Sequence, residues 1–215
     1  MKLSVIGFSL VTLLSSLSSG RTADFKPDKE GFIRNWLELG YFTGVPRFGA
    51  VDYIEIGVND GDFAKEGDKL NYAGKVLKWK ASECQEYYLD FRKLHGPPPA
   101  KVRRDQGGEY RGEMQTYILC YLVAEEEREG LKLSLGCDGP VRVFLNGKQV
   151  FIRHKNQEFK KDQEVVKEGI TLAKGANCLL VQLAKSDRKE FRACFRFLGK
   201  DGKAVTDFKI ALQKP

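Results

Sequence analysis

Residues 141–152 read VRVFLNGKQVFI and carry the clearest fold signal in the chain. Apolar residues alternate with polar ones on both sides of the Asn146-Gly147 dipeptide. Asn-Gly between two such runs is typical of a tight β-hairpin, because a type I′ turn needs positive φ at both central residues. We therefore expect Val141–Leu145 and Gln149–Ile152 to form two paired antiparallel strands.

Short apolar runs separated by turn residues continue away from this hairpin in both directions, which is typical of many short strands. Tyr117–Val123 is apolar throughout and indicates a strand covered on both faces. Phe191–Phe197 is apolar at every second residue and indicates a half-buried strand. Further strands are expected at Leu131–Leu135, Cys178–Ala184 and Val205–Leu212. Because no helical periodicity persists for more than a few turns, we predict an all-β protein.

The first 20 residues differ from the rest of the 215-residue chain. Lys2 precedes the apolar run Leu3–Leu14, and the small polar residues of Ser15–Gly20 follow. This order is typical of a secretory signal peptide. The apolar run has about 12 residues, whereas a helix that spans a bilayer needs about 20. We therefore expect an exported protein without a transmembrane segment, with an uncleaved anchor as the alternative.

The domain organisation follows from this division. We expect residues 1–20 to be the signal peptide, residues 21–30 an N-terminal linker and residues 31–215 a single β-sandwich domain. About 195 residues remain after cleavage, which is enough for one domain with a substantial core. The expected location is secreted or periplasmic.

Five cysteines in an exported protein would permit at most two disulfides. Their spacing contains no C-x-x-C pair and no zinc-binding pattern. We expect most of them to be small apolar residues inside strands. Cys194 alternates with Arg192 and Arg196, so we expect it to lie on the outer face of its strand.

The formal net charge of +7 comes from basic residues that are interleaved with acidic ones along the chain. Such a pattern, in an exported chain without an aromatic and basic repeat, does not indicate nucleic-acid binding. Affinity for an acidic polysaccharide or for the cell envelope fits the same charge. We therefore expect no nucleic-acid partner.

Three segments together resemble a known family. They are Gly31–Gly40 (GFIRNWLELG), Leu135–Phe151 with its VRVFLNGK, and Leu172–Leu183 with its KGANCLLVQL. They are similar to the galactose-binding-like, jelly-roll β-sandwich domains of secreted bacterial proteins, including the sugar-binding domains that accompany β-glycosidases. The resemblance covers most of the mature chain and implies a jelly-roll sandwich. We expect Trp36 of the first segment to cap its core.

The sequence does not indicate an enzyme. It contains only two histidines, His95 and His154, and no Gly-x-Ser-x-Gly motif. A glycosidase needs two facing carboxylates, but the acidic run Glu125–Glu127 is expected to be a solvated turn. We therefore expect no catalytic residues, although a hydrolase remains a third hypothesis.

A glycine-containing loop between Asn59 and Asp68 is rich in the oxygen ligands that Ca²⁺ prefers. Its candidate ligands are Asp60, Asp62 and Asp68. We expect no cofactor and interpret this segment as a flexible acidic loop. The family resemblance adds a structural calcium ion as the alternative.

A sugar site in such a sandwich would combine aromatic faces with Arg or polar side chains in loops at one end, because the planar guanidinium can engage two neighbouring oxygens. The candidates chosen by their loop or strand-end position are Arg153, His154, Trp79, Tyr110 and Arg103. The sequence therefore predicts a non-catalytic carbohydrate-binding module with a polysaccharide or glycan partner. The alternative is a structural or protein-interaction module of the cell envelope that binds no sugar.

Overall fold

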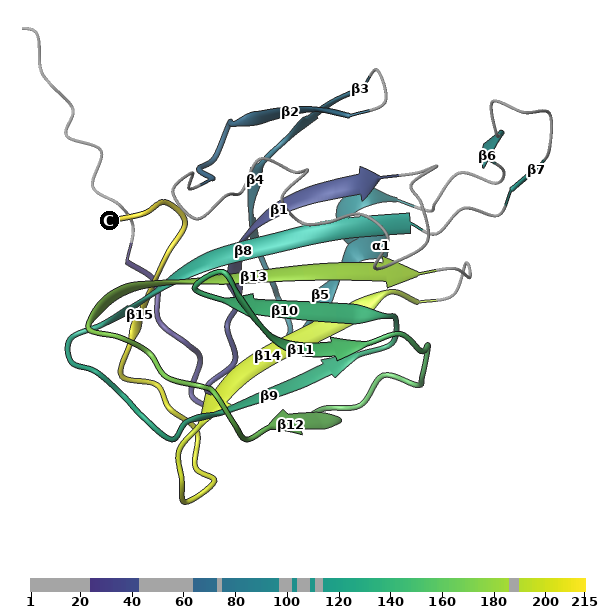
Figure 1. Ribbon diagram of the computed structural model, residues 1–215. Helices are drawn as coiled ribbons and strands as arrows, with labels where there is room; N and C mark the ends of the chain where they lie inside the picture. Colours follow the sequence, from purple (N-terminus) through teal and green to yellow (C-terminus); the bar gives the residue numbers. More distant parts are fainter. Residues whose placement is uncertain are drawn as a thin grey trace, which may run out of the picture.

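The computed structural model describes residues 24–42, 64–72, 75–96, 102–103, 109–110, 114–185 and 190–215. Within these ranges the protein consists of antiparallel strands and one short helix (Figure 1). The prediction of an all-β protein is confirmed. Two sheets face each other as the layers of a β-sandwich, and two short hairpins are added to them.

The large sheet has the strand order β11-β10-β13-β8-β1-β4, and β15 also pairs with β8. Its strands are β1 (Asn35–Phe42), β4 (Lys80–Glu83), β8 (Met114–Ala124), β10 (Val141–Leu145), β11 (Lys148–Arg153), β13 (Gly175–Lys185) and β15 (Lys209–Ala211). Because neighbouring strands are antiparallel, β1, β11 and β13 end where β8 and β10 begin. We call this edge of the molecule the loop end.

The small sheet has the strand order β12-β9-β14-β5. Its strands are β5 (Leu89–Asp90), β9 (Lys132–Cys137), β12 (Glu164–Val166) and β14 (Arg192–Leu198). A five-residue helix, α1 (Phe91–His95), follows β5 directly and is capped by the side chain of Asp90. No helical periodicity marks this segment in the sequence, because a single turn is too short to show it.

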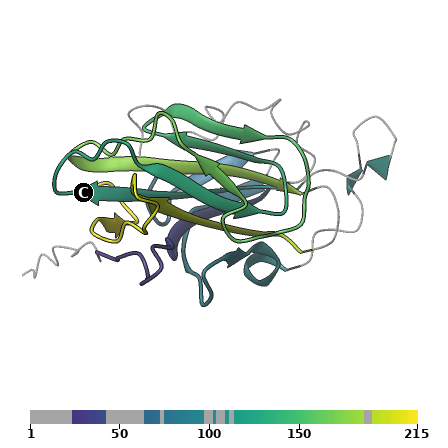
Figure 2. The ribbon, with the colours of Figure 1, turned by 90° about the horizontal axis from the view of Figure 1, so that it is seen from below.

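Two hairpins complete the described part of the chain. They are β2 (Lys69–Tyr72) with β3 (Lys75–Lys78), and β6 (Val102–Arg103) with β7 (Glu109–Tyr110). The β6–β7 hairpin lies beyond the loop end of the sandwich in both views (Figures 1 and 2).

The hairpin expected at residues 141–152 is present. Val141 pairs with Arg153, and Leu145 pairs with Lys148. Asn146 and Gly147 have φ values of 51° and 77°, as a type I′ turn requires. The prediction made from the Asn-Gly dipeptide is confirmed.

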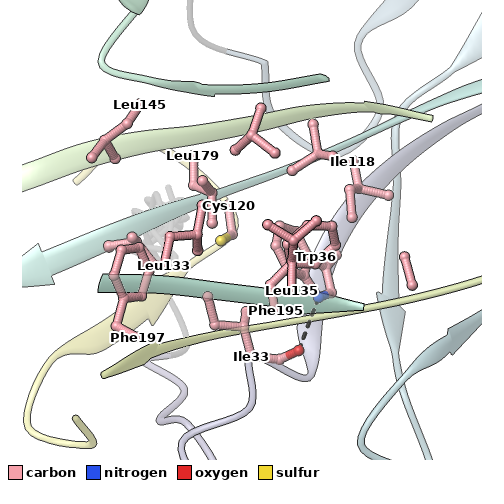
Figure 3. Packing of buried hydrophobic residues seen from close by; sticks show 14 of the residues in the cluster. Ile33, Trp36, Ile118, Cys120, Leu133, Leu135, Leu145, Leu179, Phe195 and Phe197 are labelled. Carbon is pink, nitrogen blue, oxygen red and sulfur yellow. Dashed lines mark hydrogen bonds between the residues drawn. The ribbon is translucent and has the colours of Figure 1, made fainter. Parts of the chain in front are cut away.

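The core between the two sheets is apolar and closely packed (Figure 3). Trp36 is fully buried there, and its ring meets Phe195 edge-on at a centroid distance of 5.4 Å. Its indole Nε1 donates a hydrogen bond of 3.0 Å to the carbonyl oxygen of Ile33. The expectation that Trp36 belongs to the core is confirmed.

The outer face of the large sheet is covered as well. Leu70 and Leu77 of the β2–β3 hairpin pack against a second apolar cluster that includes Leu37 and Tyr121. As a result β8 is buried at nearly every residue, as its continuous apolar sequence predicted.

The two ends of the described chain meet at the large sheet. Phe25 forms an antiparallel bridge with Ile210, the middle residue of the short strand β15. The backbone N–H of each residue donates to the carbonyl oxygen of the other at 2.8 Å. The last strand is shorter than the expected Val205–Leu212, because only Lys209–Ala211 pairs with β8.

Candidate functional site

Arg153 lies at the end of β11, where its guanidinium binds the protein itself. Its side chain is only 11% exposed. Nη2 donates to the carbonyl oxygens of Cys137 and Gly139 at 2.5 and 2.8 Å, and Nη1 lies 3.4 Å from Oε1 of Glu164. This corrects the expectation that Arg153 offers its fork to a sugar: the fork holds the β9–β10 turn against β11.

His154 and the β6–β7 hairpin lie at the loop end. His154 follows β11 directly, and its side chain is exposed. Arg103 and Tyr110 lie on paired strands, because Arg103 is opposite Glu109 and Tyr110 is opposite Val102. The side chains of this hairpin lie outside the described part of the structure, so their role in binding stays a prediction.

Trp79 separates β3 from β4 and is 3% exposed. It packs in the apolar cluster on the outer face of the large sheet, together with Leu37 and Tyr121. A buried indole has no face left for a sugar ring. This corrects the expectation that Trp79 is a stacking platform, because burial under the β2–β3 hairpin makes it part of the fold.

Of the three candidate calcium ligands, only Asp68 lies within the described residues. Asp60 and Asp62 lie outside them. Asp68 accepts a hydrogen bond from the backbone N–H of Lys65 at 3.0 Å. In the described ranges no three His, Cys, Asp or Glu side chains are grouped as a metal site, so the calcium site stays a prediction.

A buried ion cluster lies at the loop end, around the turn between β9 and β10. The side chains of Asp138 and Lys185 are each 5% exposed, and Lys185 Nζ lies 3.7 Å from Oδ1 of Asp138. The backbone N–H of Arg192 donates to both carboxylate oxygens, at 3.1 and 3.2 Å. Burial raises the pKa of Asp138, and the contacts with Arg192 and Lys185 offset part of this effect. Asp138 therefore joins the end of β13 and the start of β14 to this turn.

The backbone of Asp138 also positions the segment that follows β11. Its carbonyl oxygen accepts hydrogen bonds from the backbone N–H of Gln157 at 3.2 Å and from Lys185 Nζ at 3.1 Å. Two residues beyond Gln157, the chain places Phe159 beside Arg192. Asp138 thus positions both Arg192 and the segment that carries Phe159, which lie together on the neighbouring surface.

That surface group, which we call the aromatic cluster, consists of Tyr87, Tyr88, Phe159 and Arg192. The ring centroids of Tyr87 and Tyr88 are 5.2 Å apart, and those of Tyr88 and Phe159 are 5.3 Å apart. The guanidinium carbon of Arg192 lies 4.7 Å from the centroid of Phe159, within the range of a cation–π contact. All four residues are partly exposed. The cluster therefore presents apolar ring surface and guanidinium donors side by side.

The cluster lies on the outer face of the small sheet. Arg192 alternates along β14 with Ala193 and Phe195, which face the core. The segment that carries Phe159 reaches this face because Gly136 of β9 has no side chain. A Cβ atom there would lie 2.2 Å from the carbonyl oxygen of Lys160.

Asp162 ties the same segment to the small sheet. Its Oδ1 accepts hydrogen bonds from Ser134 Oγ at 2.6 Å and from Arg196 Nε at 2.8 Å, and its Oδ2 accepts from Arg196 Nη2 at 2.5 Å. Burial alone would raise the pKa of Asp162, but these hydrogen bonds outweigh it and hold the pKa below its ordinary value. The segment is thus fixed on both sides of Lys160.

The charges beside the aromatic cluster are balanced. Each of three cationic side chains has an acidic partner within ion-pair distance. The pairs are Arg192 with Glu190, Lys161 with Glu30, and Arg196 with Asp162. This part of the surface therefore suits a neutral ligand better than an acidic one.

A buried pair of ionisable groups lies between the sheets at the loop end. His95 Nε2 is 2.6 Å from Glu38 Oε2, and the ring of Tyr41 packs on the imidazole at a centroid distance of 4.5 Å. A histidine beside a carboxylate is one element of acid–base catalysis. Both side chains are more than nine-tenths buried, so they have little access to a substrate. The expectation that the protein is not an enzyme stays a prediction.

Sequence reasoning missed Tyr87, Tyr88 and Phe159 as site residues. They belong to two loops that are about 70 residues apart, and no local pattern links them. The available signal was the alternation of Arg192 and Arg196 with apolar residues, which placed these two arginines on the outer face of their strand.

Fold and site together define an antiparallel two-sheet β-sandwich with an aromatic and arginine cluster on the outer face of one sheet. No protein-family model matches the chain, and no curated protein matches its sequence significantly. Among the residues that the structure describes, no helix is long and apolar enough to cross a membrane.

Proposed function

We propose that this protein is a non-catalytic carbohydrate-binding module of an exported protein, of jelly-roll type and related to the galactose-binding-like domains, and that it binds a neutral glycan at the aromatic cluster. The observation that carries this proposal is a cluster of three partly exposed rings, two of which, Tyr88 and Phe159, contact the Arg192 guanidinium. The apolar face of a pyranose packs on such rings, and its hydroxyl groups accept hydrogen bonds from arginine.

The balanced charge around the cluster supports a neutral sugar. A carboxylated or sulfated sugar would have to compete with Glu190 for Arg192. A neutral sugar needs only the remaining N–H donors and the ring faces. The arrangement therefore favours neutral polysaccharides as ligands.

Affinity electrophoresis in gels that contain galactan, xylan or β-glucan tests this proposal. We expect retardation by at least one of them, and about fivefold to tenfold weaker binding in Tyr88→Ala and in Phe159→Ala, since a lost ring contact costs about 1 kcal/mol. Val165→Ala, an exposed apolar residue on β12, is the matched control and should bind like the wild type.

Circular dichroism of each variant confirms that it is folded. Mobility that none of the neutral polysaccharides changes would overturn the proposal. Equal binding by the wild type and the two ring variants would overturn the assignment of the site.

One observation favours the alternative of a protein-interaction module. β11 is the edge of the large sheet in the described residues, and it pairs there only with β10. An edge strand can accept a strand from a partner protein. A partner from the cell envelope that binds by this route would be displaced by Val150→Pro, because proline removes a backbone donor.

A further inference from the structure

The β2–β3 hairpin has one apolar face and one exposed face. Leu70 and Leu77 are paired across the two strands and pack on the large sheet. Side chains alternate along a strand, so the residues on either side of them point outward. These outward residues are exposed, and they are Lys69, Asn71, Val76 and Lys78.

The exposed face holds two lysines whose like charges lie opposite each other. Lys69 lies directly opposite Lys78 in the register of the hairpin. Both lysines are exposed, and neither forms an ion pair with another described residue. We call Lys69 and Lys78 the lysine face.

The nearby acidic groups bind the backbone instead of these lysines. Glu66 Oε1 accepts a hydrogen bond from the N–H of Ala81 at 3.3 Å, and Asp68 Oδ2 accepts one from the N–H of Lys65 at 3.0 Å. The lysine face thus keeps its positive charge, although like charges directly opposite each other destabilise a strand pair.

Protection of an open edge does not explain this arrangement fully. Each strand of this two-stranded hairpin has an open edge, and a lysine on each discourages pairing with another chain. That protection does not require the two lysines to lie directly opposite each other, where they repel. An anionic partner that lies along the hairpin would relieve the repulsion.

We propose that the lysine face is a second binding site, and that its ligand is an acidic polysaccharide. The face runs along the two paired strands of the hairpin, which suits a linear polymer. Asn71 adds an amide for sugar hydroxyl groups. Val76, 62% exposed, adds an apolar contact.

Other polyanions fit this face less well. One exposed valine gives too little apolar surface to enter a membrane interface. The described side chains of the lysine face and its neighbours Asn71 and Val76 include no aromatic ring on which the bases of a single-stranded nucleic acid could stack. The site lies on the outer side of the large sheet, whereas the aromatic cluster lies on the outer side of the small sheet, so the two sites are tested separately.

The test uses affinity electrophoresis of the full chain with polygalacturonate at low and at physiological salt. We expect the Lys69→Gln/Lys78→Gln variant to bind about tenfold more weakly or worse, since each lysine facing an anionic surface contributes several-fold to affinity. The same variant should unfold at a higher temperature than the wild type, because the cross-strand repulsion is removed.

The matched control is Lys167→Gln/Lys174→Gln. It removes the same net charge from two exposed lysines that form no ion pair with other described residues. We expect its binding to equal that of the wild type. Tyr88→Ala should also keep polygalacturonate binding, which separates this site from the aromatic cluster.

Three results would overturn the proposal. The first is unchanged mobility of the wild type in polygalacturonate. The second is an equal loss of binding in the control variant, which would show a non-specific effect of net charge. The third is binding to phosphatidylglycerol vesicles or to single-stranded DNA without binding to polygalacturonate, which would assign the face to another class of partner.

Discussion

Asp138 illustrates how much one buried carboxylate holds together at the loop end. It faces Lys185 in the interior and receives the backbone N–H of Arg192. Asparagine has the same shape but removes the negative charge that lies beside the Lys185 ammonium. We expect Asp138→Asn to lower the free energy of unfolding by about 3 kcal/mol, because it breaks a buried ion pair. Urea unfolding measures this difference.

An exposed ion pair provides the control for Asp138. Arg128 Nη1 lies 2.6 Å from Asp207 Oδ1, and the Asp207 side chain is 60% exposed. Solvent screens such a pair, so Asp207→Asn should cost less than about 1 kcal/mol. Equal effects of the two substitutions would contradict the importance of burial at Asp138.

Asp162 should make stability depend on pH with a defined sign. Its pKa is below the ordinary value in the folded state, so its ionised form stabilises the fold above pH 4 or so. This contribution is lost as the pH falls through the lowered pKa. We expect Asp162→Asn to be about 1 to 2 kcal/mol less stable than the wild type at pH 7, and the difference to shrink at pH 3 in urea unfolding. A constant difference at both pH values would contradict this.

At the scale of single residues, the sequence showed which side chains are chemically suited to bind a ligand, but not where the fold places them. Arg153 was a reasonable candidate for ligand binding because it is a cation at a strand end. In the fold, the nearest acceptors are the carbonyl oxygens of Cys137 and Gly139, which are distant in sequence. The burial of Trp79 was likewise not visible in the sequence, because it depends on the three-dimensional position of the β2–β3 hairpin.

At the scale of elements, Gly136 decides where the segment that carries Phe159 can lie. A methyl group at this position would clash with the carbonyl oxygen of Lys160. We expect Gly136→Ala to lower stability by about 1 to 3 kcal/mol, as overpacking does, and to weaken neutral-glycan binding because Phe159 is displaced. Denaturant unfolding and affinity electrophoresis measure the two effects.

Gly169→Ala separates these two effects. Gly169 has a φ of +69°, so alanine is strained there, but a Cβ atom would meet nothing within 4 Å. This variant should lose stability and keep its affinity for glycan. Loss of affinity in both variants would show that binding simply follows stability.

Local patterns predicted the strands well where turn chemistry and alternation agreed. The hairpin of β10 and β11, the doubly covered β8 and the alternation of β14 were all visible in the sequence, although the structure also buries Cys194 on the outer side of β14. The pairing of β1 with both β4 and β8 was not, because it joins residues that are distant in the chain. The aromatic cluster was not visible for the same reason, since it depends on two loops, distant in the chain, that meet over one strand.

At the scale of the whole molecule, the fold does not depend on disulfides. All five cysteines are free, and four of them are buried. Burial raises the pKa of the Cys84 and Cys137 thiols to about 12, so little reactive thiolate is present at neutral pH. Cys194 does lie on the outer side of its strand, but the segment around Lys160 covers it.

We expect dithiothreitol to leave the melting temperature unchanged. Iodoacetamide should modify at most Cys178 in the folded protein, because its side chain is the partly exposed one of the five. Mass spectrometry after alkylation measures this. A large fall in melting temperature under reducing conditions would contradict a fold held together by packing alone.

The bridge between Phe25 and Ile210 makes the chain enter and leave the sandwich at neighbouring points. A domain built in this way can be inserted into a surface loop of a larger protein through short connections, without disturbing either partner. Its own ends can equally be joined and the chain opened at an exposed turn, such as the one at Asn146-Gly147. The same sheets can therefore form both when the domain is inserted into another protein and when its chain is circularly permuted.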